Sequence, residues 1–266
     1  MAGPERIVCL TEETVETLYL LGASDRIVGV TGYAVRPPEV RREKPRVGAF
    51  TSADVPKITA LNPDLVLTFS DLQADIAADL IREGVAVHAF NQRDLSGILD
   101  MIRTLGALVD RIEAASALNS SLEAKISAIR SSVPAGPRPR VYFEEWDEPM
   151  IAGIRWVSDL IDIAGGLDVF ADKARAQDAR GRFVTSDEVI TAAPDLIVAS
   201  WCGKKVRPEK IAARDGWQVI PAIRQGQIIE VKSPLVLAPG PAALTEGLDA
   251  ISAAIATARR FLEDAA

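Results

Sequence analysis

The sequence predicts an α/β protein of two Rossmann-like lobes, each with a mainly parallel sheet, joined by one long backbone α-helix. Short apolar runs typical of buried strands alternate with amphipathic helical stretches along the 266 residues. One long helical stretch lies near the midpoint, and a related segment occurs on each side of it. We therefore expect an N-terminal lobe over residues 1–110, a connecting helix over 111–133 and a C-terminal lobe over 134–266.

The midpoint helix is predicted from the spacing of its apolar residues. At three- and four-residue steps the chain places Ile112, Ala115, Leu118, Leu122, Ile126, Ile129 and Val133. This is the repeat of an amphipathic helix, and a helix of this length reaches roughly 30 Å. Prolines at 134, 137 and 139 prevent it from continuing. Because such a helix is stiff, we expect the lobes to move little when a ligand binds.

The predicted elements of the N-terminal lobe follow in order. Strands are expected at residues 7–10, 26–33, 44–50, 64–69 and 85–90. Helices are expected from an N-cap at Thr11 to Gly22, from Ser52 or Asp54 to Leu61, and over residues 71–84 and 95–109. The run at 64–69 is continuously apolar, which is typical of a parallel strand covered on both faces.

The C-terminal lobe repeats the scheme. We expect a strand at 140–146, a helix at 156–166, a helix, turn and strand over 186–201, a short helix and strand within 217–231, and a final helix at 242–262. The segments KITALNPDLVLTFS (57–70) and EVITAAPDLIVASW (188–201) match over the helix end, the Pro-Asp turn and the strand. Pro63 and Pro194 are 194 − 63 = 131 residues apart, about half the chain, which indicates a duplicated lobe.

Composition excludes several function classes. The net charge is −7 and no dense Lys/Arg cluster is present, which argues against a nucleic-acid partner. No apolar run approaches the roughly 20 residues of a membrane span. The two cysteines, Cys9 and Cys202, lack metal-ligand spacing, and His88 is the only histidine. We therefore expect no protein-ligated metal site.

An enzymatic interpretation rests on the acidic run at 144–148. Its Glu145 and Asp147 would act as general acid and base in a cleft hydrolase. No partner group at a defined spacing supports this chemistry, and P-loop, dinucleotide-binding and nucleophile-elbow motifs are absent from the sequence. The hydrolase is the least favoured interpretation, and we predict a binding protein without catalytic residues.

The candidate binding residues follow the predicted strands, because open parallel sheets bind ligands at the carboxyl ends of their strands. We expect the two lobes to leave a cleft there. Most of the candidates are aromatic, although aromatic residues make up only 5% of the chain, and this placement favours stacking on a large flat ligand. Thr11 and Glu12 also follow the first strand. The predicted ligand-binding residues are Tyr33, Phe50, Thr51, Phe69, Glu145, Trp146, Trp156, Trp201 and Cys202.

Four segments carry a resemblance to a known family: ALNPDLVL (60–67), EEWDEPMIAGIRWVSDLIDIAGG (144–166), Trp-Cys-Gly (201–203) and APGPAALTEGL (238–248). Together they resemble the helical-backbone (class III) periplasmic substrate-binding proteins of ABC importers, and most closely the vitamin B12-binding group. The resemblance implies a monomer that holds cobalamin or a related corrinoid in the cleft. The corrinoid brings its own cobalt ligands, so no intrinsic cofactor is expected. Tyr33 and Phe50 match cleft aromatics of the family, and Phe50 stands where tryptophan is common.

Related ligands remain open within the same fold. Iron–siderophore and haem binders share it, and haem would take Tyr33 as its axial ligand. A cytoplasmic corrinoid carrier is a further alternative, because no leader precedes the first strand in this sequence. The resemblance itself implies a periplasmic location, whereas a true start at Met1 implies the cytoplasm.

The family docks on its transporter through one acidic residue per lobe, seven residues ahead of the Pro-Asp turn. In the second lobe this position is Asp187. In the first lobe it is Pro56, and Asp54 is the nearest acidic residue. Since proline cannot supply a charge, Asp54 and Asp187 are the predicted docking residues for an ABC importer permease dimer.

Overall fold

The computed structural model describes residues 3–264, which form two compact units. The first unit contains the described residues up to Glu123 together with Ala238–Pro241, and the second contains Ala124–Leu237 and the residues from Ala242 onwards. The division falls inside α6 (Ile112–Ser132), the helix predicted to connect the lobes. The predicted fold class, α/β with mainly parallel sheets and a long backbone helix, is confirmed.

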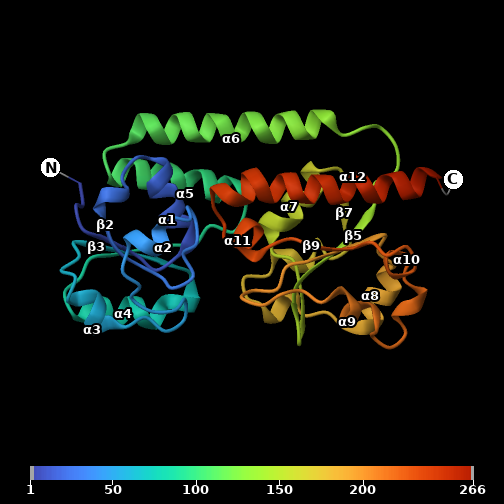
Figure 1. Cartoon of the computed structure of the whole chain (residues 1–266), viewed down its shortest axis with the longest axis horizontal. Helices are drawn as coiled ribbons and strands as arrows, with labels where there is room; N and C mark the ends of the chain where they lie inside the picture. The colour runs from blue at the N-terminus through green and yellow to red at the C-terminus, as the bar shows by residue number, and fades with distance from the viewer. Residues whose placement is uncertain (1–2, 265–266) are drawn as a thin grey trace. The chain divides into compact units, whose positions relative to one another are not determined.

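The first unit is built on a parallel sheet of order β2-β1-β3-β4. Its strands are β1 (Ile7–Cys9), β2 (Ile27–Val30), β3 (Leu65–Phe69) and β4 (Val87–Phe90). Its helices ahead of α6 are α1 (Glu12–Leu20), α2 (Val40–Glu43), α3 (Val55–Thr59), α4 (Ala74–Arg82) and α5 (Leu95–Leu108). Helices α3 and α4 lie together on one side of the sheet and α5 lies on the other (Figure 1). Val8 and Val66 of the sheet pack there with Ile58 and Leu80.

The strand predicted at 44–50 is wrong. Only isolated bridges form in this stretch, one between Val30 and Arg46 and one between Gly48 and Ala53. Pro45 has no N–H to give to a ladder, and Gly48 has a φ of +143°, which turns the chain back on itself. The segment therefore lies beside β2 for one residue pair and becomes a loop at the carboxyl end of the sheet.

The second unit has a five-stranded sheet of order β6-β5-β8-β9, with β7 also paired to β5. Its strands are β5 (Arg140–Asp147), β6 (Met150–Ala152), β7 (Leu167–Asp168), β8 (Leu196–Ala199) and β9 (Ile228–Glu230). Its helices are α7 (Arg155–Ile163), α8 (Ser186–Ala192), α9 (Pro208–Ala212), α10 (Pro221–Arg224), α11 (Ser233–Val236) and α12 (Leu248–Asp264), the last preceded by a π-helical turn over Ala243–Gly247. All pairs are parallel except the β5–β6 hairpin, which the sequence did not predict.

Helix α6 buries only part of its predicted apolar stripe. Ala115 and Leu122 are buried, whereas Ile112 at its start is 67% exposed. Asn119 completes the buried face, and its side-chain amide donates to the Leu99 carbonyl at 2.9 Å. No helix within residues 3–264 has the length and apolar character that a membrane span requires.

Candidate functional site

The loops at the carboxyl ends of the first unit's strands are held together by Gln73. This buried side chain accepts the Phe69 N–H at 2.9 Å and donates to the carbonyls of Leu10 at 3.1 Å and Phe50 at 2.7 Å. One amide therefore joins the segments that follow β1 and β3 to the loop that carries Phe50. Sequence reasoning missed Gln73, because a glutamine at the start of a helical segment gives no sign of being buried.

Tyr33 and Phe50 lie in adjacent loops of this edge. The Gly32 N–H donates to the Gly48 carbonyl at 2.7 Å, which brings the two loops side by side. The Tyr33 side chain is 47% exposed, Phe50 is half-buried and Thr51 is exposed. These three predicted residues therefore present accessible surface on one edge of the sheet.

Phe69 lies deeper than the sequence predicted. Its side chain is only 6% exposed, and the Arg93 guanidinium carbon is 5.4 Å from the centre of its ring. Arg93 also donates to the Asp71 carboxylate at 3.3 Å. Phe69 thus supports a charged group at the surface, and Arg93 is a strand-end residue that the aromatic pattern did not reveal.

Two carboxyl groups begin α1 in the same unit: Glu12 is half-buried and Glu13 is buried. Burial raises the pKa of Glu12 to about 8, with further contributions from Glu13 and Glu16. Burial likewise raises the pKa of Glu13 to about 7. The Gln92 amide lies 3.4 Å from the Glu13 carboxyl and donates to the Pro239 carbonyl at 3.1 Å. These two carboxyls therefore exchange protons near neutral pH.

Two glutamates of the acidic run at 144–148 form ion pairs with arginine side chains of the second unit. Glu144 is fully buried, pairs with Arg214 at 2.5 and 3.0 Å, and accepts the indole N–H of Trp201 at 3.0 Å. Glu145 forms a bidentate ion pair with the buried Arg182. These partners give both glutamates structural roles, which disfavours the hydrolase interpretation.

A lysine lies against two tryptophans of the second unit. The Lys204 ammonium is 4.1 Å from the ring centre of Trp146 and 4.9 Å from that of Trp201, and it pairs with Asp147. Trp146 is partly exposed, whereas Trp201 is 3% exposed. Of the two predicted stacking residues, only Trp146 therefore has an accessible ring, and Lys204 covers part of it.

Trp156 and Cys202 have contrasting surroundings. Trp156 is 3% exposed, and its indole N–H donates to the Val236 carbonyl at 2.9 Å, which ties α7 to α11. Cys202 is exposed in the loop that follows β8. The Cys202 side chain is therefore accessible to a ligand. The Trp156 side chain is part of the core of its unit.

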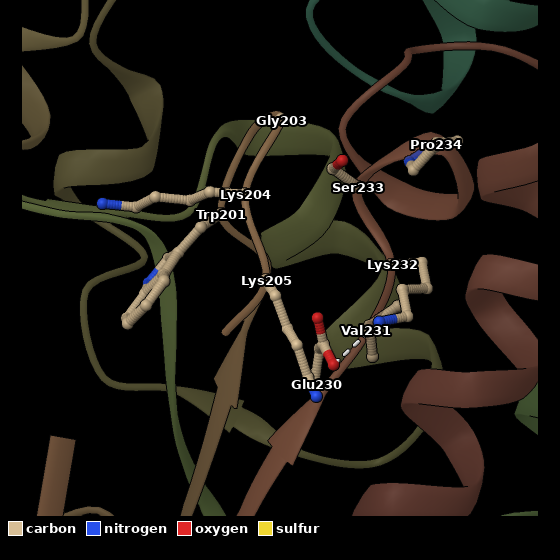
Figure 2. A pocket seen from close by; sticks show the side chains of 9 residues that line it. All are labelled: Trp201, Gly203, Lys204, Lys205, Glu230, Val231, Lys232, Ser233 and Pro234. Carbon is tan, nitrogen blue, oxygen red and sulfur yellow. Dashed lines mark ion pairs between the residues drawn. The ribbon is translucent and has the colours of Figure 1, made fainter. Parts of the chain in front are cut away.

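A pocket of about 240 Å³ opens beside this loop in the second unit. The loop after β8 lines one side with residues 201 and 203–205, and the end of β9 with the start of α11 lines the other with residues 230–234. In Figure 2 the Lys205 and Lys232 side chains approach Glu230, whereas the Lys204 side chain points away from them. The Glu230 carboxylate pairs with the Lys232 ammonium at 2.8 Å.

The predicted docking residues are at the surface. Asp54 is exposed and caps α3, where its carboxylate accepts the Lys57 N–H at 3.0 Å. Asp187 is exposed in the first turn of α8, beside the capping box formed by Thr185 and Glu188. Pro56 is also exposed. Both carboxylates are accessible to a partner, and their docking role stays a prediction.

Metal-ligating side chains do not cluster in the part of the chain that the structure describes: no group of three His, Cys, Asp or Glu residues there would hold an ion. His88 lies in β4 with its ring centre 4.3 Å from that of Phe90. Burial lowers the pKa of His88.

Comparison with known proteins gives consistent matches. A sequence model of the family described as periplasmic binding protein matches residues 7–235. A cobalamin-binding protein of Halobacterium salinarum is 28% identical over 200 residues, which cover 73% of this chain and 53% of the relative, so the chain spans about half that relative's length. An uncharacterized ABC transporter substrate-binding lipoprotein of Bacillus subtilis, YvrC, is 28% identical over 260 residues, covering 95% of this chain and 80% of the relative.

Two solved structures illustrate the fold match. The periplasmic haem-binding protein RhuT of Roseiflexus has a TM-score of 0.80 at 25% identity, covering 95% of this chain and all (100%) of that one. The periplasmic vitamin B12-binding protein BtuF of Vibrio cholerae has a TM-score of 0.78 at 21% identity, covering 97% and 99% of the two chains. At this identity the second match shows the fold alone.

Proposed function

Because the chain belongs to the periplasmic binding protein family, we propose that it captures cobalamin or a related corrinoid and delivers it to an ABC importer. The family consists of extracytoplasmic solute-binding proteins, which are not enzymes. The observation that carries the corrinoid is the 28% identity with a cobalamin-binding protein over 73% of this chain. The accessible aromatic side chains at the strand ends support it, because a corrin ring offers a large flat face for stacking.

We propose ligand-binding residues in the carboxyl-end loops of each unit. Tyr33 and Phe50 supply stacking surface from the first unit, and Thr51 offers a hydroxyl to the amide groups of the corrinoid. Trp146, near the end of β5, supplies stacking surface from the second unit, and Cys202 lies in the loop that follows β8. Gln73 holds the Phe50 loop in place before the ligand arrives. The part of the site in the first unit therefore needs little ordering when a ligand binds.

A second candidate ligand is haem. RhuT, a haem-binding protein, matches this chain at 25% identity, and the Tyr33 phenol is accessible enough to serve as an axial iron ligand. Tyr33→Phe separates the two candidates. It removes the ligating oxygen and so abolishes haem coordination, whereas it keeps the ring and leaves corrinoid affinity within about threefold.

Titration calorimetry of the whole chain tests the proposal. Cyanocobalamin, haemin and a ferric hydroxamate siderophore are each titrated into protein at tens of micromolar. We expect saturable heat with cyanocobalamin at a Kd below about 10 μM, which corresponds to roughly 7 kcal/mol of binding free energy. Absence of heat with cyanocobalamin, together with binding of haemin or the siderophore, would overturn the corrinoid assignment.

Transport is tested separately from ligand binding. We propose Asp54 and Asp187 as the docking charges, since both are exposed on helix N-termini. Replacing Asp187 with Asn is expected to reduce corrinoid uptake by cells at least several-fold while leaving the Kd for cyanocobalamin unchanged, because rim charges govern partner association. Unchanged uptake in the Asp54→Asn/Asp187→Asn double variant would contradict this docking role. Fractionation of cells expressing the native gene tests the extracytoplasmic location.

A further inference from the structure

The pocket between the loop after β8 and the start of α11 carries an excess of positive charge. Its lining includes three lysines, Lys204, Lys205 and Lys232, and one carboxylate, Glu230. The Lys204 ammonium is held by Asp147 and the two indoles. The Lys232 ammonium pairs with Glu230 at 2.8 Å. Within residues 3–264 Lys205 takes part in no ion pair. Its positive charge is therefore the one in the pocket lining that no carboxylate neutralises.

Glu230 orders this group of cations. Besides Lys232, its carboxylate accepts the Val206 N–H at 3.2 Å. The hydrogen bond from the Lys232 side chain is the main cause that keeps the pKa of Glu230 below its ordinary value, and the positive charge of Lys205 adds to the effect. The ionised Glu230 thus holds the Lys232 ammonium beside the pocket. Lys205 and Lys232 both line the pocket, so both ammonium groups are available to an anion there.

The volume of the pocket limits what it holds. The pocket has a volume of about 240 Å³. Sites that enclose a whole drug-sized ligand are larger, at about 300–1,000 Å³. A carboxylate or phosphate substituent with its hydration fits, whereas a macrocycle does not. The pocket therefore suits one side group of a larger molecule.

We infer that this pocket is a subsite for an anionic substituent of the ligand, bound by the ammonium groups of Lys205 and Lys232. The inference rests on the proposed function and narrows it to corrinoids in which a side-chain amide is replaced by a free carboxylate. Ammonium groups form charge-assisted hydrogen bonds with such oxygens. The preference is weakened by salt, because the lysines are exposed.

A matched pair of ligands tests the inference. Cyanocobalamin and each of its monocarboxylic acids differ only in one amide replaced by a carboxylate. At about 20 mM salt we expect one acid isomer to bind about tenfold more tightly than the amide, which corresponds to one partly exposed charge-assisted contact. Lys205→Gln reduces the ratio to about one. Lys210→Gln, which removes the same charge from α9 outside the pocket, leaves it unchanged.

Glu230→Gln is expected to change the preference for the acid over the amide in the opposite direction to Lys205→Gln. The amide still accepts the Val206 N–H, and removal of the competing carboxylate raises the preference for the acid several-fold further. Equal binding of amide and acid by the unaltered protein would overturn the inference and leave the corrinoid function standing.

Inorganic phosphate keeps the test independent of the corrinoid. If cyanocobalamin and its acids all fail to bind, the proposed function falls. The subsite is then judged by amide shifts of Gly203, Lys205 and Ser233 in nuclear magnetic resonance spectra during a phosphate titration at constant ionic strength. Saturable shifts that disappear in Lys205→Gln support the anionic subsite. Absence of saturable shifts in the unaltered protein overturns it.

Discussion

The Asp195 carboxylate accepts the backbone N–H of Arg140 at 2.8 Å, while the Arg140 guanidinium donates to the Ala192 carbonyl at 2.9 and 2.8 Å. The first unit contains the same arrangement. There Asp64 accepts the Arg6 N–H at 3.0 Å, and the Arg6 guanidinium donates to the Leu61 carbonyl at 3.2 and 2.6 Å. In both units the Pro-Asp turn therefore fixes the start of one strand to the end of the helix that precedes its neighbour.

Removal of this carboxylate is expected to destabilise each unit. Asp64→Ala and Asp195→Ala each leave a backbone N–H at the beginning of a strand without its side-chain acceptor, at a cost of about 1 kcal/mol in the free energy of unfolding. Urea unfolding followed by circular dichroism measures the change. Asp215→Ala, on an exposed loop of the second unit, serves as the control and stays within about 0.5 kcal/mol. Equal stability of all three variants would contradict a structural role for the repeat.

The Pro-Asp repeat was readable in the sequence because it is local, and so were most strands and helices. Periodicity also located α6, with an end one residue from the prediction. The strand predicted at 44–50 did not form because the apolar and small residues Val47 to Phe50 do not reveal the φ of Gly48. Duplication of the lobe followed from two matching segments and appears again in matching hydrogen bonds.

The candidate site was only partly readable. Position after a strand predicts which loops lie at the carboxyl edge, and Tyr33 and Phe50 are accessible there. It does not predict which side of the loop a side chain takes. Trp156 and Trp201 are both buried. Inside the unit their indole N–H groups donate to the Val236 carbonyl and the Glu144 carboxylate. No sequence pattern marked Lys205 or Gln73 as a site residue, since their roles depend on tertiary contacts.

Gln73 is predicted to control both stability and ligand affinity. Gln73→Ala leaves the Phe69 N–H and the Leu10 and Phe50 carbonyls without their partner, and an unsatisfied buried polar group costs about 1–3 kcal/mol. Loosening of the Phe50 loop should also weaken cyanocobalamin binding about tenfold, since the loop must then be ordered on binding. Urea unfolding and calorimetric titration measure the two effects.

The control for this prediction is Gln225→Ala, which removes an exposed amide at the end of α10. It is expected to alter neither quantity. A Gln73→Ala protein that is destabilised but binds cyanocobalamin as tightly as before would show that the Phe50 loop does not contribute to the site.

The Glu144–Arg214 ion pair is predicted to be the ion pair of the second unit whose disruption costs the most stability. Glu144 is fully buried, so Arg214→Gln leaves its carboxylate without a cation, at a cost of about 3 kcal/mol. Glu144→Gln/Arg214→Gln removes the stranded charge and is expected to recover part of this stability. A double-mutant cycle by urea unfolding checks the coupling. Additive losses would show that the two side chains do not depend on each other.

The raised pKa values of Glu12 and Glu13 in α1 lead us to expect that the protein loses stability as pH rises. The pKa of Glu12 rises from its ordinary 4.5 to about 8, and that of Glu13 rises to about 7, with burial as the main cause for both. Between pH 4.5 and 8 the folded protein therefore holds more protons on these groups than the unfolded chain does. Their contribution to stability is fully present below the unfolded pKa and is lost as pH rises through the folded values.

A variant isolates this effect from the other titrating groups. In Glu12→Gln/Glu13→Gln neither side chain can ionise, so the variant is expected to gain stability relative to the unaltered protein as pH rises from about 5 to about 8.5. Urea unfolding of both proteins at half-unit steps gives the difference. The neutral amide that replaces the Glu13 carboxyl still accepts the Gln92 N–H through its oxygen, which preserves the contact with Pro239. A constant difference across this range would mean that the two carboxyls titrate alike in the folded and unfolded states.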